Sequence, residues 1–341
     1  MEKKINILAT MALTGQSKIR IRGVSDRIQL RVIPAETVDN IPDECWAETD
    51  ILYTWNILPD AGKAPNLKWV QFKSAGINRY IDHPFFQIPE IIATTSSGVI
   101  TSQIAEYVLM AMLAFGQKLP ELRAYQQRRQ WPERGEKRQV LLPVELRYST
   151  VGILGYGSIG RQVARLLRPF GTTVLAVKKD AMHPEDTGYT EEGMGDPHGD
   201  FFQRLYPMEA LHSMLSECDF VVAALPLTKA TQHILDASAF EAMKETAYLI
   251  NVGRGELIDQ AALIRALEMG QIAGAALDVF EEEPLPEENP LWEIPQVIIS
   301  PHVSGLSRHF DEDTISLFIE NLNRYMADLP LHNRIDPDLG Y

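Results

Sequence analysis

Short apolar runs recur along the first hundred residues, and longer mixed stretches separate them. The runs cover residues 5–10, 28–33, 51–55, 67–72 and 91–95. Runs of this length between turn-forming residues are typical of buried strands, and the intervening stretches are long enough to form helices. The pattern therefore predicts alternating strands and helices, that is, an α/β layer structure.

Six further apolar runs follow later in the chain, at 150–154, 173–177, 220–225, 247–252, 273–280 and 297–300. Amphipathic segments with helical spacing lie between most of them, at 158–168, 208–215 and 260–269. Parallel strands need crossover segments of this kind, so the pattern predicts a doubly wound parallel sheet.

One stretch, 182–206, breaks this rhythm because it is polar and rich in glycine and aspartate. Long loops in compact domains are either functional lids or surface excursions. We expect a surface excursion here, with a functional lid as the alternative.

The chain has 341 residues, more than twice the roughly 150 residues typical of one domain, so two domains are expected. Two connections that contain turn formers, at 96–98 and 304–305, are candidate hinges. They predict a split organisation, in which the first and last parts of the chain form one domain around an inserted second domain.

Acidic residues outnumber basic ones by 46 to 32, which gives a formal net charge of −14. Such a charge disfavours binding to nucleic acids and anionic membranes, so an anionic ligand must be bound by local positive groups. The apolar stretch 104–115 is too short for a bilayer and contains Glu106, which predicts a core or interface helix. The N-terminus lacks a sustained signal-peptide core, so we expect a cytoplasmic protein.

The only two cysteines, Cys45 and Cys218, form neither a metal-binding motif nor a dense framework of bridges. We expect both to be buried as small hydrophobic side chains, and we expect no metal site.

The sequence GYGSIG at 155–160 fits the GxGxxG pattern, directly after an apolar run and at the start of a predicted helix. Gly155 would permit the tight turn, Gly157 would leave room for a pyrophosphate, and Gly160 would let the helix approach the strand. The N–H groups at the helix N-terminus would then face the phosphates of a dinucleotide. The alternative is a purely structural glycine turn.

The residues after the next strand bear on the choice of dinucleotide. An acidic residue usually stands there, about 20 residues after the glycines, and binds the adenosine ribose of NAD. Here Lys178 and Lys179 follow the run 173–177, and two ammonium groups at this position favour the 2′-phosphate of NADP(H). In the alternative, Asp180 reaches the ribose and NAD(H) is bound.

Three later strand ends carry ionisable residues, namely Arg254, Glu283 and His302. Ligands of open parallel sheets bind at the carboxyl ends of strands, so these side chains should converge beside the glycine turn. Arg254 could bind a substrate carboxylate and polarise a neighbouring ketone, while His302, oriented by Glu283, could protonate the developing alkoxide as hydride arrives. Each residue also has a structural alternative: a bridge between domains, a solvated acidic run and a strand cap, respectively.

These residues resemble the D-isomer-specific 2-hydroxyacid dehydrogenase family over nearly the whole chain. The resemblance rests on VGILGYGSIG at 151–160, LPLT at 225–228, NVGRGELID at 251–259, LDVFEEEP at 277–284 and SPH at 300–302. It implies two Rossmann-like doubly wound domains, with a nucleotide-binding domain (100–303) inserted into a flavodoxin-like substrate-binding domain (1–99 plus 304–341). It also implies the catalytic roles of Arg254, Glu283 and His302. The cofactor contacts that it implies come from the glycine turn with Ser158 and Ile159, and from Thr101, Pro226, Val252 and Asp278.

The loop KSAGIN at 73–78 is similar to the substrate loop of that family, in which the N–H groups of Ala75 and Gly76 would hold the substrate carboxylate. Arg79 is a further candidate contact, with an exposed loop arginine as the alternative. Lys178 departs from the NAD-type pattern of the family and is similar to the NADPH-using glyoxylate and hydroxypyruvate reductase branch.

The resemblance therefore implies reduction of a small 2-oxo acid to a D-2-hydroxy acid. A phosphoglycerate- or D-lactate-dehydrogenase-like activity with NAD stays open, as does a non-enzymatic, corepressor-like sensor of dinucleotides. Members of the family are commonly homodimers that pair through their nucleotide domains, and the stretch 104–115 together with Trp131 could supply apolar contacts.

Overall fold

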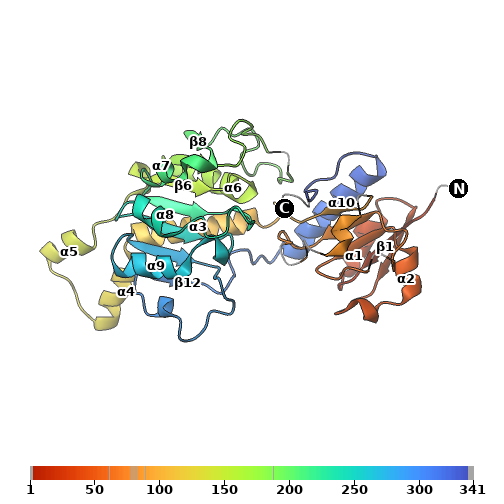
Figure 1. Ribbon diagram of the computed structural model, residues 1–341, viewed down its shortest axis with the longest axis horizontal. Helices are drawn as coiled ribbons and strands as arrows, with labels where there is room; N and C mark the ends of the chain where they lie inside the picture. Colours follow the sequence, from red (N-terminus) through yellow and green to blue (C-terminus); the bar gives the residue numbers. More distant parts are fainter. Residues whose placement is uncertain are drawn as a thin grey trace. The chain divides into compact units, whose positions relative to one another are not determined.

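The computed structural model describes residues 3–60, 62–77, 80, 83–88, 90–186 and 188–336. The chain divides into two compact units (Figure 1). The first unit combines Met1–Val99, Thr187–Tyr189 and Ser307–Tyr341, and the second combines Ile100–Asp186 and Thr190–Leu306. Both units contain a parallel sheet, so the predicted fold class, two doubly wound α/β domains, is confirmed.

The first unit is built on a five-stranded sheet whose strands all run parallel in the order β2-β1-β3-β4-β5. This is the strand order of flavodoxin-like folds, as the family resemblance implied. The strands are β1 (Ile5–Ala9), β2 (Ile28–Val32), β3 (Ile51–Thr54), β4 (Trp69–Phe72) and β5 (Ile92–Thr94).

Helices of the first unit bury both faces of this sheet. The long helix α10 (Phe310–Met326) places Phe318 against the ring of Tyr53, with the two ring centroids 4.5 Å apart. The other helices are α1 (Gly15–Arg22) and α2 (Asp43–Glu48), with short 3₁₀ turns η1 (Val38–Asn40) and η2 (Pro84–Gln87). The C-terminal part of the chain thus completes the core that the first hundred residues begin.

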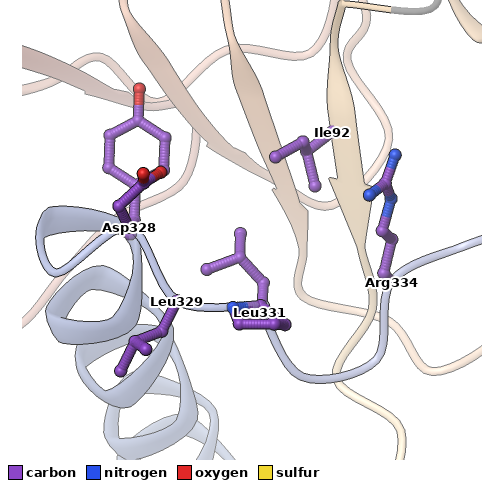
Figure 2. A pocket seen from close by; sticks show the side chains of 7 residues that line it. Ile92, Asp328, Leu329, Leu331 and Arg334 are labelled. Carbon is purple, nitrogen blue, oxygen red and sulfur yellow. The ribbon is translucent and has the colours of Figure 1, made fainter.

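A hollow of about 320 Å³ lies in the first unit, between the end of α10 and the edge strand β5. Figure 2 shows Ile92 on β5 and Arg334 on the segment that follows α10. That segment pairs with the free edge of β5 through an antiparallel bridge from Arg334 to Thr94. The segment covers backbone groups that an edge strand would otherwise expose.

The second unit is built on a seven-stranded parallel sheet in the order β12-β11-β10-β9-β6-β7-β8. Six strands coincide with predicted runs: β6 (Thr150–Leu154), β7 (Thr173–Val177), β9 (Phe220–Ala223), β10 (Tyr248–Asn251), β11 (Gly274–Leu277) and β12 (Val297–Ile299). The sequence pattern missed the seventh strand, β8 (Arg204–Tyr206), which has only three residues and lies at the sheet edge.

Two layers of helices cover the sheet of the second unit, and each encloses its own apolar core. The helices are α3 (Thr101–Gly116), α4 (Leu119–Arg128), α5 (Arg134–Val140), α6 (Ser158–Leu167), α7 (Leu211–Leu215), α8 (Ala237–Ala242) and α9 (Gln260–Glu268). The 3₁₀ turns are η3 (Leu146–Tyr148), η4 (Arg168–Phe170), η5 (Met208–Ala210), η6 (Gly255–Leu257) and η7 (Pro290–Trp292). Within the part of the chain that the structure describes, no helix is long and apolar enough to span a membrane.

Helices α4 and α5 form an arm that projects from the rest of the second unit (Figure 1). Several large apolar side chains of this arm are exposed, and Trp131 between the two helices is 88% exposed. In contrast, α3, which contains the predicted core helix 104–115, buries Val108, Ala111 and Met112 completely.

The excursion 182–206 is a loop up to the short strand β8, at 204–206, where the expectation of a loop is wrong, and buried groups anchor its first part to α6. The guanidinium of Arg161, which is 1% exposed, donates hydrogen bonds to the carbonyls of Pro184 and Asp196 and lies 3.4 Å from the carboxylate of Asp186. The hydroxyl of Tyr156 donates to Asp196 Oδ2 over 2.6 Å. Burial and the neighbouring carboxylate raise the pKa of Tyr156. A charged side chain is rarely buried without partners, so these contacts fix the loop in place.

Both cysteines are buried and unpaired, as predicted. Burial raises the pKa of Cys218 to about 12, so this thiol is a packing group and not a nucleophile.

Candidate functional site

The three ionisable residues that the sequence singled out follow the carboxyl ends of three neighbouring strands of the second unit. Arg254 follows β10, Glu283 follows β11 and His302 follows β12. These strands are adjacent and parallel, so they lie about 4.8 Å apart and their carboxyl ends share one edge of the sheet. The arrangement brings the three residues to the same edge although the chain separates them by up to 48 positions (302 − 254 = 48).

Glu283 holds the ring of His302 by a direct hydrogen bond. Nδ1 of His302 lies 2.8 Å from Oε2 of Glu283, and the other oxygen, Oε1, accepts the backbone N–H of Phe280 over 3.1 Å. An ionised carboxylate can only accept, so Nδ1 is the donor and Nε2 is left as the outer nitrogen of the ring. The side chain of His302 is 54% exposed, which makes Nε2 accessible to a ligand.

The buried carboxylate of Asp278 shapes the turn that carries His302. It is fully buried and accepts three hydrogen bonds, from the hydroxyl of Ser300 and from the backbone N–H groups of Val303 and Ser304. The backbone carbonyl of Asp278 accepts the N–H of His302 over 2.8 Å. His302 has a φ of 54°, a left-handed conformation uncommon outside glycine, and these bonds hold it there. A contact from Asp278 to a cofactor, which the resemblance implies, stays a prediction.

The turn that carries Arg254 packs directly against the turn before Glu283. A Cβ added at Gly255 would lie 1.9 Å from the backbone carbon of Phe280, so only glycine permits this approach. The buried side chain of Asn251 braces the same turn, because its amide donates to the carbonyl of Arg254 and its oxygen accepts the N–H of Gly253. The half-buried guanidinium of Arg254 donates to the carbonyl of Gly253 over 2.7 Å.

The glycine turn after β6 has the geometry of a dinucleotide site. Gly155 has a φ of 97°, and a Cβ at Gly160 would lie 2.2 Å from the carbonyl oxygen of Gly155. A Cβ at Gly157 would meet no atom within 4 Å, so the N-terminus of α6 faces open space there. The turn lies between β6 and β9, where the strand order reverses and where such folds bind dinucleotides. These residues fit a pyrophosphate group.

The other residues that are expected to contact a cofactor also lie in the second unit. Ser158 and Ile159 begin α6, Val252 directly follows β10 with 5% exposure, and Thr101 begins α3 with 8% exposure. Pro226 follows β9, and its carbonyl accepts the hydroxyl of Thr231 over 2.7 Å. Each of these residues lies just after a strand or at the start of a helix of the second unit. Their contacts to a cofactor stay predictions.

Lys178 lies at the end of β7, next to the excursion. Its ammonium donates to the backbone carbonyls of His183 and Glu185. Partial burial, followed by the positive charge of Arg161, lowers the pKa of Lys178. Lys179 is exposed, and Asp180 is turned toward His183, with 2.7 Å between Oδ2 and Nδ1.

The predicted substrate loop lies in the first unit, directly after β4. Ala75 is exposed and Gly76 is half-buried, while the carbonyl of Ser74 accepts the N–H of Ser96 over 2.9 Å. Arg79 lies outside the described residues. The structure therefore describes this loop and the three ionisable residues in two separate units.

Sequence reasoning missed a buried cation at the start of this loop. Lys73 is 7% exposed, and its ammonium lies 2.5 Å from Oδ1 of Asp311 and above the rings of Trp55 and Phe310. The signal was present, since a lysine directly after a buried strand needs a partner. The partner is at the other end of the chain, and no local pattern identifies it.

The chain is similar to a known protein family, in sequence and in fold. The family model described as "D-isomer specific 2-hydroxyacid dehydrogenase, NAD binding domain" matches residues 109–304. A glyoxylate reductase of Aeropyrum pernix is 33% identical in an alignment of 283 residues that covers 81% of this chain and 79% of that protein. One of Thermofilum pendens is 33% identical over 76% of this chain and 72% of that protein. A D-isomer specific 2-hydroxyacid dehydrogenase of Xanthobacter autotrophicus Py2, solved with NADPH and MES, has a TM-score of 0.80 at 26% identity and covers all of both chains.

We predict that Asp278→Ala destabilises the turn that carries His302. The change removes the acceptor of two backbone N–H groups, those of half-buried Val303 and buried Ser304, which should lower the free energy of unfolding by about 3 kcal/mol. Urea unfolding measures the loss, and hydrogen exchange should show faster exchange at Val303 and Ser304. Glu282→Ala, which removes an exposed carboxylate nearby, is the control and should stay within about 0.5 kcal/mol of the wild type. Equal stability of the Asp278 and Glu282 variants would contradict this account of the turn.

Proposed function

This chain belongs to the D-isomer specific 2-hydroxyacid dehydrogenase family and is thus a nicotinamide-dependent oxidoreductase; from this premise we propose that it reduces a small 2-oxo acid to the D-2-hydroxy acid. Glyoxylate and hydroxypyruvate are the substrates that we favour. The names of the Aeropyrum pernix and Thermofilum pendens relatives support glyoxylate.

The observation that carries the proposal is the hydrogen bond between His302 and Glu283 at the sheet edge where Arg254 lies. The bound dinucleotide supplies the hydride. Arg254 binds the carboxylate of the substrate and polarises its ketone, and His302 gives the proton on Nε2 to the oxygen that becomes the hydroxyl. Glu283 keeps Nε2 directed outward by holding Nδ1. In the reverse direction, the same nitrogen accepts the proton.

The substrate loop of the first unit supplies the second carboxylate contact in this proposal. The N–H groups of Ala75 and Gly76 bind the substrate carboxylate, and Arg79 is an additional candidate. The exposure of Ala75 supports this role, because its backbone can be reached by a ligand.

We expect the wild-type protein to oxidise NADPH in the presence of glyoxylate or hydroxypyruvate, and His302→Ala to lower kcat by about 10²- to 10⁴-fold. Nucleotide affinity should stay unchanged, because His302 acts on the substrate. Absorbance at the nicotinamide band across a panel of 2-oxo acids measures the rates, and nucleotide titration measures the affinity.

His233→Ala is the matched control, since His233 also pairs with a glutamate of the second unit, Glu281, over 2.9 Å. It should retain near-wild-type kcat. Nucleotide binding without turnover of any 2-oxo acid would favour the dinucleotide-sensing alternative instead.

For the cofactor, we propose a preference for NADP(H) over NAD(H). Two lysines follow β7, and Asp180, which could bind a ribose, is held by His183. The NADPH complex of the Xanthobacter autotrophicus Py2 enzyme supports the same assignment.

We expect kcat/KM to be at least tenfold higher with NADPH than with NADH, a difference of about 1.4 kcal/mol that one charge-assisted contact to phosphate can supply. Lys178→Ala should reduce this ratio, while a surface change remote from the turn, Lys244→Ala, should not. A higher kcat/KM with NADH would overturn the preference.

We also propose that the protein is a homodimer that pairs through the arm of the second unit. The arm exposes Leu119, Leu122, Trp131 and Leu142, and side chains of this size exposed together are typical of interfaces.

Sedimentation equilibrium should therefore give twice the chain mass of 38.4 kDa. The double variant Trp131→Asp/Leu142→Asp should shift the mass to that of one chain, because each aspartate would be buried without a partner. Met269→Asp, at a side chain 73% exposed outside the arm, should leave the mass unchanged. A monomeric wild type would show the dimer to be wrong.

A further inference from the structure

The segment just after β7 turns the carboxylate of Asp180 back on its own loop. Oδ1 accepts the backbone N–H of Met182 over 3.1 Å, and Oδ2 lies 2.7 Å from Nδ1 of His183. The hydrogen bond from His183 lowers the pKa of Asp180, so the carboxylate is ionised and Nδ1 of His183 donates. Both oxygens of Asp180 are therefore used inside the loop.

The orientation of Asp180 matters because of where the residue stands. A carboxylate at the end of this strand binds the ribose hydroxyls of a dinucleotide and repels a 2′-phosphate. Asp180 is three residues beyond the last residue of β7, within reach of that role. His183 restrains it and offsets part of its charge by hydrogen bonding.

The positive groups in this segment are arranged differently. Lys178 points its ammonium at two backbone carbonyls of the excursion, which fix the side chain without neutralising its charge. Lys179 is exposed beside it. The other charged groups that act on Lys178 are Arg161, Asp186, Asp180 and Glu185.

The excursion itself is held independently of His183. Buried Arg161 binds the carbonyls of Pro184 and Asp196, and the side-chain oxygen of Gln162 accepts the N–H of Gly195 over 2.7 Å. The side chain of His183 is 77% exposed and contributes nothing to this core. Removing its imidazole should leave the backbone of the loop, including the carbonyls that hold Lys178, in place.

We propose that His183 is a positioning residue for cofactor specificity: by holding Asp180 back, it leaves Lys178 and Lys179 to select a 2′-phosphorylated adenine nucleotide. This inference rests on the proposed NADP(H) preference and extends it by naming the residue that keeps a competing carboxylate out of the site. It predicts that the loss of His183 harms binding only when Asp180 is present and charged.

The experiment is isothermal titration calorimetry of the full chain with two probes, adenosine 2′,5′-bisphosphate and adenosine 5′-monophosphate. The probes differ by the 2′-phosphate alone, and neither carries a nicotinamide, so binding is read without turnover. The variants are His183→Ala, Asp180→Asn and the double variant. His198→Ala removes another exposed histidine of the same excursion and serves as the control.

The wild type should bind the bisphosphate at least tenfold more tightly than the monophosphate, as one charge-assisted contact to phosphate allows. His183→Ala should reduce this ratio by about three- to tenfold, the range of an exposed charge interaction. Asp180→Asn should keep or raise the ratio, and the double variant should recover the wild-type ratio. His198→Ala should match the wild type.

Either of two results would overturn the inference about His183 and leave the NADP(H) preference untouched. If His183→Ala keeps the wild-type ratio, the pair does not set specificity. If the double variant is as impaired as His183→Ala, then His183 contacts the phosphate itself and does not act through Asp180. A wild type that binds both probes equally would instead refute the NADP(H) preference on which the inference rests.

Discussion

The hydrogen bond between His302 and Glu283 exists because β11 and β12 are parallel neighbours that end at one edge of a sheet. Parallel strands need crossover connections, and these connections separate the two residues by 19 positions in the chain. The same rule places Arg254 after β10 and the glycine turn after β6. One constraint, the shared direction of the strands, therefore determines which distant residues can act together.

The candidate site at this sheet edge depends on a few points where two backbone segments lie very close to each other. Gly255 lets the turn of Arg254 lie against Phe280, and Gly160 lets α6 lie against Gly155. Buried polar groups then fix the turns: Asp278 under His302 and Asn251 under Arg254. Each buried group has its partners, so the site is rigid where its side chains must be directed.

Periodicity and motif spacing predicted eleven of the strands, the doubly wound α/β organisation and the buried cysteines. Strands that are buried on both faces read as unbroken apolar runs, which makes them visible in a sequence. The edge strand β8 was missed because three residues give no period. Long-range partners were invisible for a different reason: Lys73 pairs with Asp311, 238 positions away, and nothing local signals which acid it meets. The roles of the site residues toward substrate and cofactor rest on the proposal above.

Because the net charge of the molecule is negative, anionic ligands must be recognised by local positive groups. With a formal net charge of −14, the protein as a whole repels the phosphates and carboxylates that the proposed function requires it to bind. Each anionic group must then meet a fixed positive element, such as the N-terminus of α6 or the guanidinium of Arg254. A nearby carboxylate is costly at such a point unless it is restrained. Glu283 is restrained by Phe280 and His302, and Asp180 by Met182 and His183. In both places a hydrogen bond from a histidine offsets part of the negative charge of the carboxylate, at the sheet edge where Arg254 lies and in the segment that carries Lys178.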